Sequence, residues 1–429
     1  MRRKGGKKDE EMSRRISQSL LGILVVLAAF GLTSMVFPAM TWSQAKTVKI
    51  GVLEPLSGPL GMLGKLNKMA YDYAADKINS LGGVKSMGGA KIELLYGDDE
   101  GKPEVGISQT EILLRKGVCA MTGAYSSSVI YAATAVTERH KIPYVNPSGA
   151  AENINERGFK YCFRYMPTAG RMVQDQIKAV VYLGELTGKK PKKVGILVED
   201  TLFGQATRAG VRKWAKEYSM EVVADLSYSL KQSDFTTEIS KLKAAGPDIT
   251  FMSPYLADAI QIRRTMYELR FESMGGIIGS SGLQHSEYRT TLGPMADYTF
   301  TLDHYHPDTK VPGVKEFHKD FVSKYGEKNI TGSTALSYGS LVVLWDALER
   351  AGTDNGEKLR DAIAKTDLKV GERTNISPYG VKFDEKGENI RATLLAEQIQ
   401  KGELIPFYPA DMVSGKAIWP VPKWEEFVK

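Results

Sequence analysis

The chain has 429 residues, of which 42% are hydrophobic and 25% are charged, the composition of a globular protein. This length exceeds what one hydrophobic core usually organises, so we expect two domains. Residues 1–45 hold seven Lys or Arg and three Asp or Glu, and the remainder carries 50 basic and 47 acidic residues, which indicates no nucleic-acid partner.

Residues 1–45 have the pattern of a secretory signal peptide. Arg14 and Arg15 precede an apolar stretch of about 18 residues, and the small residues of Ser43-Gln44-Ala45 follow it. An uncleaved membrane anchor needs an apolar stretch of similar length, but the small residues favour cleavage after Ala45. Two start sites, Met1 and Met12, stay open. We therefore expect an exported protein.

A first series of strands and helices follows this segment. The apolar runs predict strands at 48–53, 92–96, 118–122 and 142–145, and a short extended piece at 161–165. Helical patterns lie between them: one ends at Gly82-Gly83, one runs from Pro103 to Leu114, and one begins at the serines 126–128.

A second series repeats the alternation. It predicts helices at 169–186, 204–218, 234–244 and 257–270, and strands at 194–198, 222–226, 249–252 and 276–279. Such alternation is typical of parallel sheets covered by helices on both faces, so we expect an α/β fold with two doubly wound lobes. Residues 303–429 contain too little predicted strand for a third lobe, and we expect them to complete the first two.

Small polar residues follow two neighbouring predicted strands. Ser126–Ser128 follow one strand and Ser148-Gly149-Ala150 follow the next. In open parallel sheets, ligands bind beyond the carboxyl ends of the strands, where helix N-termini offer unpaired N–H groups and partial positive charge. Added hydroxyls favour a carboxylate or similar anion, and glycine allows a close approach to the backbone. The alternative is that each serine only caps its own helix, a common role.

Several short motifs resemble one protein family. They are VKIGV at 48–52, LSGP at 56–59, NSLGGV at 79–84, YGDD at 96–99, GAYSSS at 123–128, the segment 143–150, and Phe163-Arg164. In this order they resemble the periplasmic substrate-binding proteins of branched-chain amino acid ABC importers, and the resemblance covers about residues 46–429.

The resemblance implies the type I periplasmic binding protein fold, with a hinge of three crossovers near Pro167, Leu302 and Phe383. Lobe 1 would comprise 46–167 and 303–383, and lobe 2 would comprise 168–302 and 384–429. It implies a periplasmic monomer without cofactor or catalysis, which captures a small carboxylate-bearing solute by closure of the lobes and delivers it to an ABC permease. The solute would be a branched-chain or related amino acid, or an aromatic or aliphatic acid. A ligand-sensing receptor subunit and a binder of an amide or urea are the alternatives.

The resemblance also implies the ligand-binding residues. The carboxylate would be held by Ser126 and by Ser148, Gly149 and Ala150, within a site that includes Tyr125 and Ser127. From lobe 2, Phe203, Tyr255 and the Ser280-Ser281 loop would face the ligand, and Leu63 would pack on it.

Two residues depart from the family pattern. Ser281 stands where amino-acid-binding members have a carboxylate that pairs with the ligand ammonium, and Ala150 replaces a threonine. A buried ammonium without a charged partner costs several kcal/mol. We favour a carboxylate that lacks an α-amino group. Alternatively, Asp258, Glu199 or Asp200 would pair with the amine.

The remaining reactive side chains indicate no metal site. The acidic run Asp98-Asp99-Glu100 lacks further ligands at a suitable spacing, and His304 and His306 are interpreted as surface histidines. Cys119 and Cys162 are the two cysteines, and they would form either one disulfide or two buried thiols.

Overall fold

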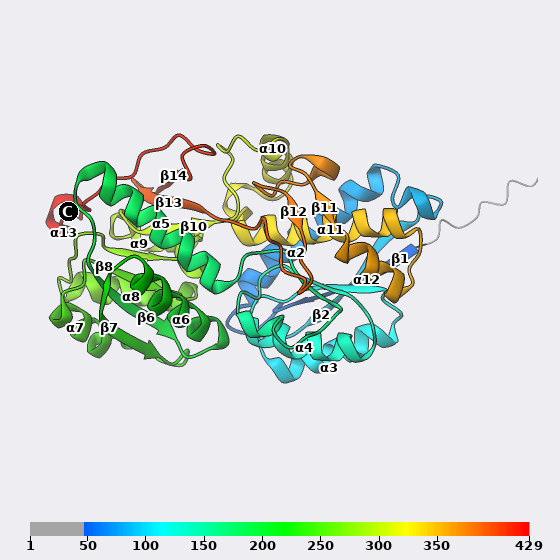
Figure 1. Ribbon diagram of the computed structural model, residues 1–429, viewed down its shortest axis with the longest axis horizontal. Coiled ribbons are helices and arrows are strands. Elements are labelled where there is room, and N and C mark those ends of the chain that lie inside the picture. Colours follow the sequence, from blue (N-terminus) through cyan, green and yellow to red (C-terminus); the bar gives the residue numbers. More distant parts are fainter. Residues whose placement is uncertain (1–46, 429) are drawn as a thin grey trace, which may run out of the picture. The chain divides into compact units, whose positions relative to one another are not determined.

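The structure, a computed structural model, describes residues 47–428. The predicted signal peptide of residues 1–45 lies outside the described residues. Within 47–428, no helix is both long and apolar enough to cross a bilayer. The described chain builds two main sheets, each with helices on both faces (Figure 1).

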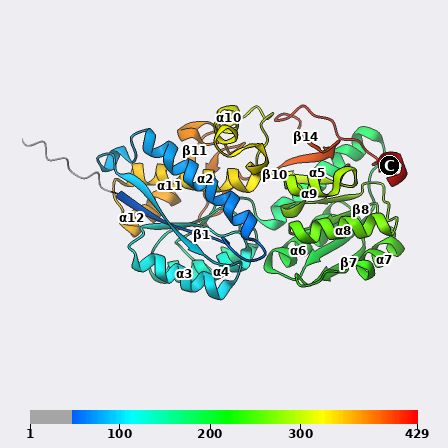
Figure 2. The same cartoon turned by 180° about the vertical axis from the view of Figure 1, so that it is seen from behind.

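The first sheet has five parallel strands in the order β2-β1-β3-β4-β5. They are β1 (Thr47–Glu54), β2 (Lys91–Asp98), β3 (Ala120–Gly123), β4 (Tyr144–Asn146) and β5 (Cys162–Arg164). Helices α3 (Pro103–Arg115) and α4 (Ser127–Arg139) cover one face. Helices α2 (Gly61–Ser80), α11 (Gly332–Ala351) and α12 (Gly356–Ala364) lie over the other (Figures 1 and 2).

The second sheet has seven strands in the order β14-β13-β10-β9-β8-β6-β7. The strands β6 (Lys193–Glu199), β7 (Glu221–Tyr228), β8 (Ile249–Met252), β9 (Ile277–Gly279) and β10 (Phe300–Asp303) are parallel. The antiparallel β13 (Leu395–Gln400) and β14 (Glu403–Tyr408) extend the sheet beyond β10. Helices α5 (Ala169–Thr187) and α6 (Leu202–Glu217) pack together on one face, and α7 (Thr236–Ala245) and α8 (Leu256–Glu268) lie on the other (Figure 2).

The predicted α/β fold with parallel-sheet lobes is confirmed, and for two strands no bounds were predicted. Strand β10 continues the parallel series, and β14 pairs with β13 through a tight turn. Lys401 and Gly402 have φ of 51° and 79° in this turn, as the favoured two-residue hairpins require.

The chain passes from one sheet to the other three times. The passages follow β5, follow β10, and precede β13. They lie side by side, because one small cavity is lined by Met166 and Pro167 of the first passage, His304 of the second, and Thr393 of the third. Residues 314–364 return as helices α10 (Val314–Tyr325), α11 and α12, of which α10 and α11 pack on α2 and α12 packs on α11.

The two cysteines do not form a disulfide, and that alternative is wrong. Cys119 precedes β3 and Cys162 lies on β5, and both are buried thiols. Strand β4 lies between β3 and β5, and register pairs Met121 with Tyr144 and Tyr144 with Cys162. Two strand spacings separate the thiols by about 10 Å, which exceeds the reach of a disulfide.

Candidate functional site

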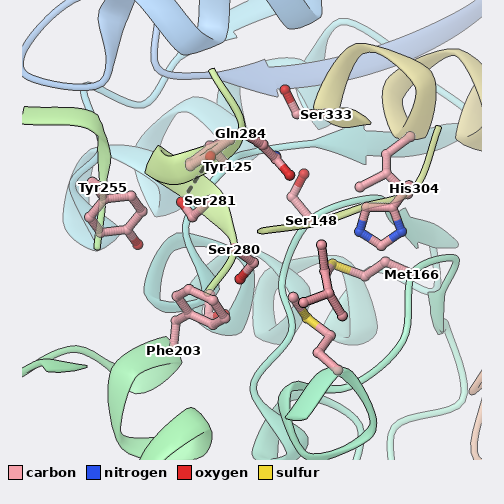
Figure 3. Close-up of a pocket in the computed structure, with 14 residues that line it drawn as sticks. Tyr125, Ser148, Met166, Phe203, Tyr255, Ser280, Ser281, Gln284, His304 and Ser333 are labelled. Carbon is pink, nitrogen blue, oxygen red and sulfur yellow. Dashed lines mark hydrogen bonds between the residues drawn. The ribbon is translucent and has the colours of Figure 1, made fainter. Parts of the chain in front are cut away.

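A cavity of about 490 Å³ lies at the carboxyl ends of strands from both sheets (Figure 3). Its lining residues follow β3, β4, β5, β6, β8, β9 and β10, lie on β10, or belong to α5 and α11. They are Tyr125, Ser127, Ser148, Met166, Met172, Phe203, Tyr255, Ser280, Ser281, Gln284, Leu302, His304, Ser333 and Leu336. This edge of an α/β sheet is where ligands bind.

Four helices begin at the cavity wall. Ser127 is the first residue of α4, Phe203 the second of α6 and Ser333 the second of α11, and Tyr255 is the N-cap residue of α8. Helix N-termini carry unpaired N–H groups and a partial positive charge. The backbone therefore favours a negatively charged group in this cavity.

The two predicted serine junctions, which follow β3 and β4 of the first sheet, meet at the cavity. Ser127 is 2% exposed, and its Oγ accepts a hydrogen bond from the Ala151 N–H at 3.3 Å. The Oγ of Ser148 is buried without a hydrogen-bond partner among the described residues. A buried hydroxyl without a partner costs free energy that a ligand oxygen in contact with it would recover.

A buried arginine fixes the loop that carries Ser148. Arg164 donates hydrogen bonds to the carbonyls of Gly149 and Ala151 and to Oε2 of Glu388, the last at 2.9 Å. Asn146 Oδ1 accepts from the N–H groups of Ser148 and Gly149 at 3.1 and 2.7 Å. The loop is thus held by charged and bidentate contacts before any ligand arrives.

Four predicted residues, Leu63, Ser126, Gly149 and Ala150, do not line the cavity. Ser126 caps α4, because its Oγ accepts a hydrogen bond from the Val129 N–H at 3.3 Å. This is the alternative role, helix capping, that was given for the serines. Gly149 and Ala150 are buried behind the wall. A Cβ at Gly149 would lie 2.8 Å from side-chain atoms of Ile130 and Ile154, so this glycine serves packing and not access to the backbone.

Aromatic and hydroxyl side chains from the two sheets meet across the cavity. The Tyr125 hydroxyl lies 3.1 Å from Ser281 Oγ, and the Tyr125 and Tyr255 rings are 6.0 Å apart (Figure 3). Leu63 packs against both rings from behind and is 3% exposed. Burial raises the pKa of Tyr125 to about 12, so its hydroxyl stays protonated and available as a donor.

Among the described residues that line the cavity, none is an Asp, Glu, Lys or Arg. Glu199 and Asp258, expected as alternative partners of an amine, bind neighbours instead. Glu199 accepts from Thr201 Oγ1 and Ser253 Oγ, and Asp258 accepts from the Tyr228 hydroxyl at 3.1 Å. Burial raises the pKa of Glu199 to about 8, so it is mainly neutral at pH 7. Asp200 is exposed and does not line the cavity.

The interpretation of His304 and His306 as surface residues is wrong. His304 follows β10 and lines the cavity, and His306 is 9% exposed. Burial lowers the pKa of His304 to about 3, so its imidazole is neutral at pH 7. The two histidines were expected to share a strand end, but without a supporting carboxylate pattern nothing indicated that this strand end faces a ligand site.

The apolar side chains from α5, α11 and the chain passages that line the cavity were not predicted from the sequence, nor were some of the polar ones. The residues not anticipated as ligand-facing are Met166, Met172, Gln284, Leu302, His304, Ser333 and Leu336. For Ser333 a pattern existed, because Thr331 and Thr334 form a capping box that marks the start of α11.

Acidic residues elsewhere organise loops. Asp98 Oδ1 accepts the N–H groups of Leu56, Ser57 and Glu100, at 2.9 to 3.3 Å. Across residues 47–428, no group of three or more His, Cys, Asp or Glu side chains is placed to hold a metal ion.

A protein-family model described as "Periplasmic binding protein" matches residues 47–403. The chain is also similar to the Leu/Ile/Val-binding protein homolog 8 of Brucella abortus, with 29% identity over 409 residues, 94% of this chain and 98% of the relative. The Leu/Ile/Val-binding protein homolog 7 of Brucella melitensis is 26% identical over 400 residues, 90% and 96% of the two chains.

Solved structures share the fold. The branched-chain amino acid transporter substrate-binding protein LivJ of Streptococcus pneumoniae, in complex with isoleucine, has a TM-score of 0.72 at 23% identity over 86% of this chain and 99% of that one. A solute-binding protein of an ABC transporter from R. palustris, in complex with benzoate, has a TM-score of 0.73 at 19% identity over 87% and 99%. The type I periplasmic binding protein fold expected from the sequence is confirmed.

Proposed function

The chain belongs to the periplasmic binding protein family, and from this premise we propose that it captures a small carboxylate-bearing solute outside the cytoplasm and delivers it to an ABC importer. Homologous proteins are named as Leu/Ile/Val-binding, and proteins of the same fold were solved with isoleucine, leucine or benzoate. Those ligands share a carboxylate and an apolar body.

One observation carries the proposal: four helix N-termini and the Ser127 and Ser148 hydroxyls converge on one cavity that is also lined by apolar side chains. The helix ends and hydroxyls suit the carboxylate. Met166, Met172, Leu302, Leu336 and Phe203 suit the apolar body, which they would remove from water.

In the proposed mechanism, the two sheet units are lobes that close on the solute about the three chain passages. Each lobe supplies part of the cavity wall, so the complete set of contacts exists only in the closed form. The solute then stabilises closure by its higher affinity for that form, and the permease would recognise the closed protein.

Binding without turnover fits the chemistry of the cavity. His304 is the one imidazole among the described lining residues, and with a pKa of about 3 it is too weak a base to activate a serine hydroxyl at neutral pH.

A thermal-shift screen of residues 46–429 tests the proposal. Aromatic and aliphatic acids, amino acids, amides and urea are added separately, and the carboxylates should raise the melting temperature in a concentration-dependent way. Stabilisation by amides or urea alone would contradict the carboxylate site.

A further inference from the structure

We propose that the solute is a monocarboxylate whose remaining part is uncharged, without an α-ammonium group, and that Ser281 sets this preference. The inference rests on the proposed function and narrows its substrate class. It follows from the charges of the cavity wall, from the bonds of the nearby acids, and from the backbone around Ser281.

The first step concerns the side chains in contact with the solute. Of the 14 described lining residues, none is an acid, and those with polar side chains carry hydroxyl, amide or imidazole groups. These groups bind a hydroxyl, a carbonyl or a carboxylate. An ammonium enclosed here would leave water without gaining an ionic partner, which proteins avoid.

The second step concerns four buried acids near the cavity. Asp303 lies between the lining residues Leu302 and His304, and its Oδ1 accepts a hydrogen bond from the His304 N–H at 2.6 Å. Glu199 ends β6, is 0% exposed, and uses both carboxyl oxygens to accept hydroxyl hydrogen bonds from Thr201 and Ser253. Asp258 accepts from Tyr228. Glu54 ends β1, is 0% exposed, and accepts from Asn67 Nδ2 at 3.2 Å. Burial raises the pKa of all four acids, which disfavours the charged form of each.

The third step concerns the backbone. The helices α4, α6, α8 and α11 all present their N-terminal ends to the cavity, and each has at least 13 residues. Their partial positive charges favour an anion and oppose a cation. The lining side chains and the helix N-termini therefore both favour an anionic group over an ammonium.

The fourth step concerns Ser281. It lies opposite lobe 1, with its Oγ 3.1 Å from the Tyr125 hydroxyl, and Ser280 and Gln284 of the same segment also line the cavity (Figure 3). Its φ is +57°, in the left-handed region that Asp and Asn tolerate better than most residues. Aspartate at this position fits the backbone, and the Tyr125 hydroxyl would donate to it. Position 281 could thus carry a carboxylate but provides a hydroxyl instead.

Matched solute pairs test the inference by isothermal titration calorimetry. The pairs are 3-phenylpropionate and phenylalanine, 4-methylpentanoate and leucine, and phenylacetate and phenylglycine, and the members of each pair differ only by the α-ammonium. We expect at least one acid to bind the wild-type protein at least tenfold more tightly than its amino acid. An amino acid that binds as tightly as its acid, or more tightly, overturns the inference and leaves the proposed function standing.

The variant Ser281→Asp provides the reciprocal test. We expect the variant to shift the ratio of the two affinities at least tenfold in favour of the amino acid. The introduced carboxylate would pair with the ammonium of the amino acid and would repel the carboxylate of the acid. Ser227→Asp, on the exposed end of β7, is the matched control and should leave both affinities unchanged. An unchanged ratio in a folded Ser281→Asp protein overturns the role of Ser281. If none of the six compounds binds, the inference fails. The thermal-shift screen of further carboxylates then decides whether the proposed function, capture of a carboxylate-bearing solute, also fails.

Discussion

The hydroxyl of Tyr125 lies 3.1 Å from Oγ of Ser281, and this contact joins residues 156 positions apart in the chain. Tyr125 follows β3 of the first sheet, and Ser281 follows β9 of the second. A hydrogen bond between loops of the two sheets exists only while the cavity is closed. Tyr125 therefore both lines the ligand site and helps to hold the two sheet units together around it.

Removal of this hydroxyl should weaken solute binding. In Tyr125→Phe the ring still packs on Tyr255 and Leu63, but the bond to Ser281 is lost. We expect a loss of about 0.5–1.5 kcal/mol of binding free energy, as for one neutral hydrogen bond. Calorimetric titration measures it, with Tyr267→Phe as the control, because that ring packs on Trp424 outside the cavity. Equal losses in both variants would mean that the Tyr125–Ser281 bond plays no part in closure.

Substitution of Ser126 should lower folding stability, whereas substitution of Ser148 should weaken solute binding. Ser148→Ala removes a buried hydroxyl that has no partner among the described residues, so we expect unchanged stability and a loss of about 1–3 kcal/mol in carboxylate binding. Ser126→Ala removes the N-cap of α4 and should cost about 0.5–2 kcal/mol of folding stability. Melting curves and titrations of both variants check this. A Ser148→Ala protein with wild-type affinity would place the carboxylate elsewhere.

The sequence was sufficient to predict the two sheets and the edge at which the serines gather. Alternating strand and helix patterns determine that Ser126–Ser128 and Ser148 follow adjacent parallel strands, and parallel strands end at one edge. Which serine faces the cavity depends on the helix start. Ser126 adopts an extended backbone and turns its Oγ to Val129, and this leaves Ser127 at the wall.

The other half of the cavity depends on contacts between distant segments. Leu336 and Ser333 lie on a buried helix that packs in the first sheet's unit although it follows β10 of the second sheet in the chain, and Met166 lies in a chain passage. Local patterns of hydrophobicity do not say which sheet such a helix will cover. For a similar reason no bounds were predicted for the short strand β10, because its pairing with β9 and β13 defines it.

The cysteines should remain thiols under oxidising conditions. Cys162 is buried and its pKa is raised to about 12 by burial, and β4 separates it from Cys119. We expect no reaction of either thiol with a disulfide reagent in the native protein, and two thiols per chain after denaturation in urea. A reductant should leave the melting temperature unchanged. A single chain that shows no thiol after denaturation would demonstrate a disulfide.

Glu199 should make the folded protein less stable as the pH rises. Burial raises its pKa to about 8 in the folded state, against about 4.5 in an unfolded chain. Between these values the folded protein keeps a proton that the unfolded chain has lost, so its contribution is present below pH 4.5 and is lost as the pH rises to 8. Glu199→Gln removes this titration. The variant should equal the wild type near pH 5 and exceed its free energy of unfolding by about 2–4 kcal/mol at pH 8.5.

Urea unfolding at several pH values measures this difference. His304 and His285, with pKa values lowered by burial to about 3 and 4, contribute stability above pH 6.5 that is lost as the pH falls, and Asp303, with a pKa near 7, adds to the loss at high pH. These groups are common to both proteins and cancel in the comparison. Glu221→Gln, at an exposed position on β7, should leave the pH profile unchanged. A constant offset between wild type and Glu199→Gln would mean that Glu199 is already ionised in the folded protein, and an anion beside this cavity would then be available to pair with a cationic solute.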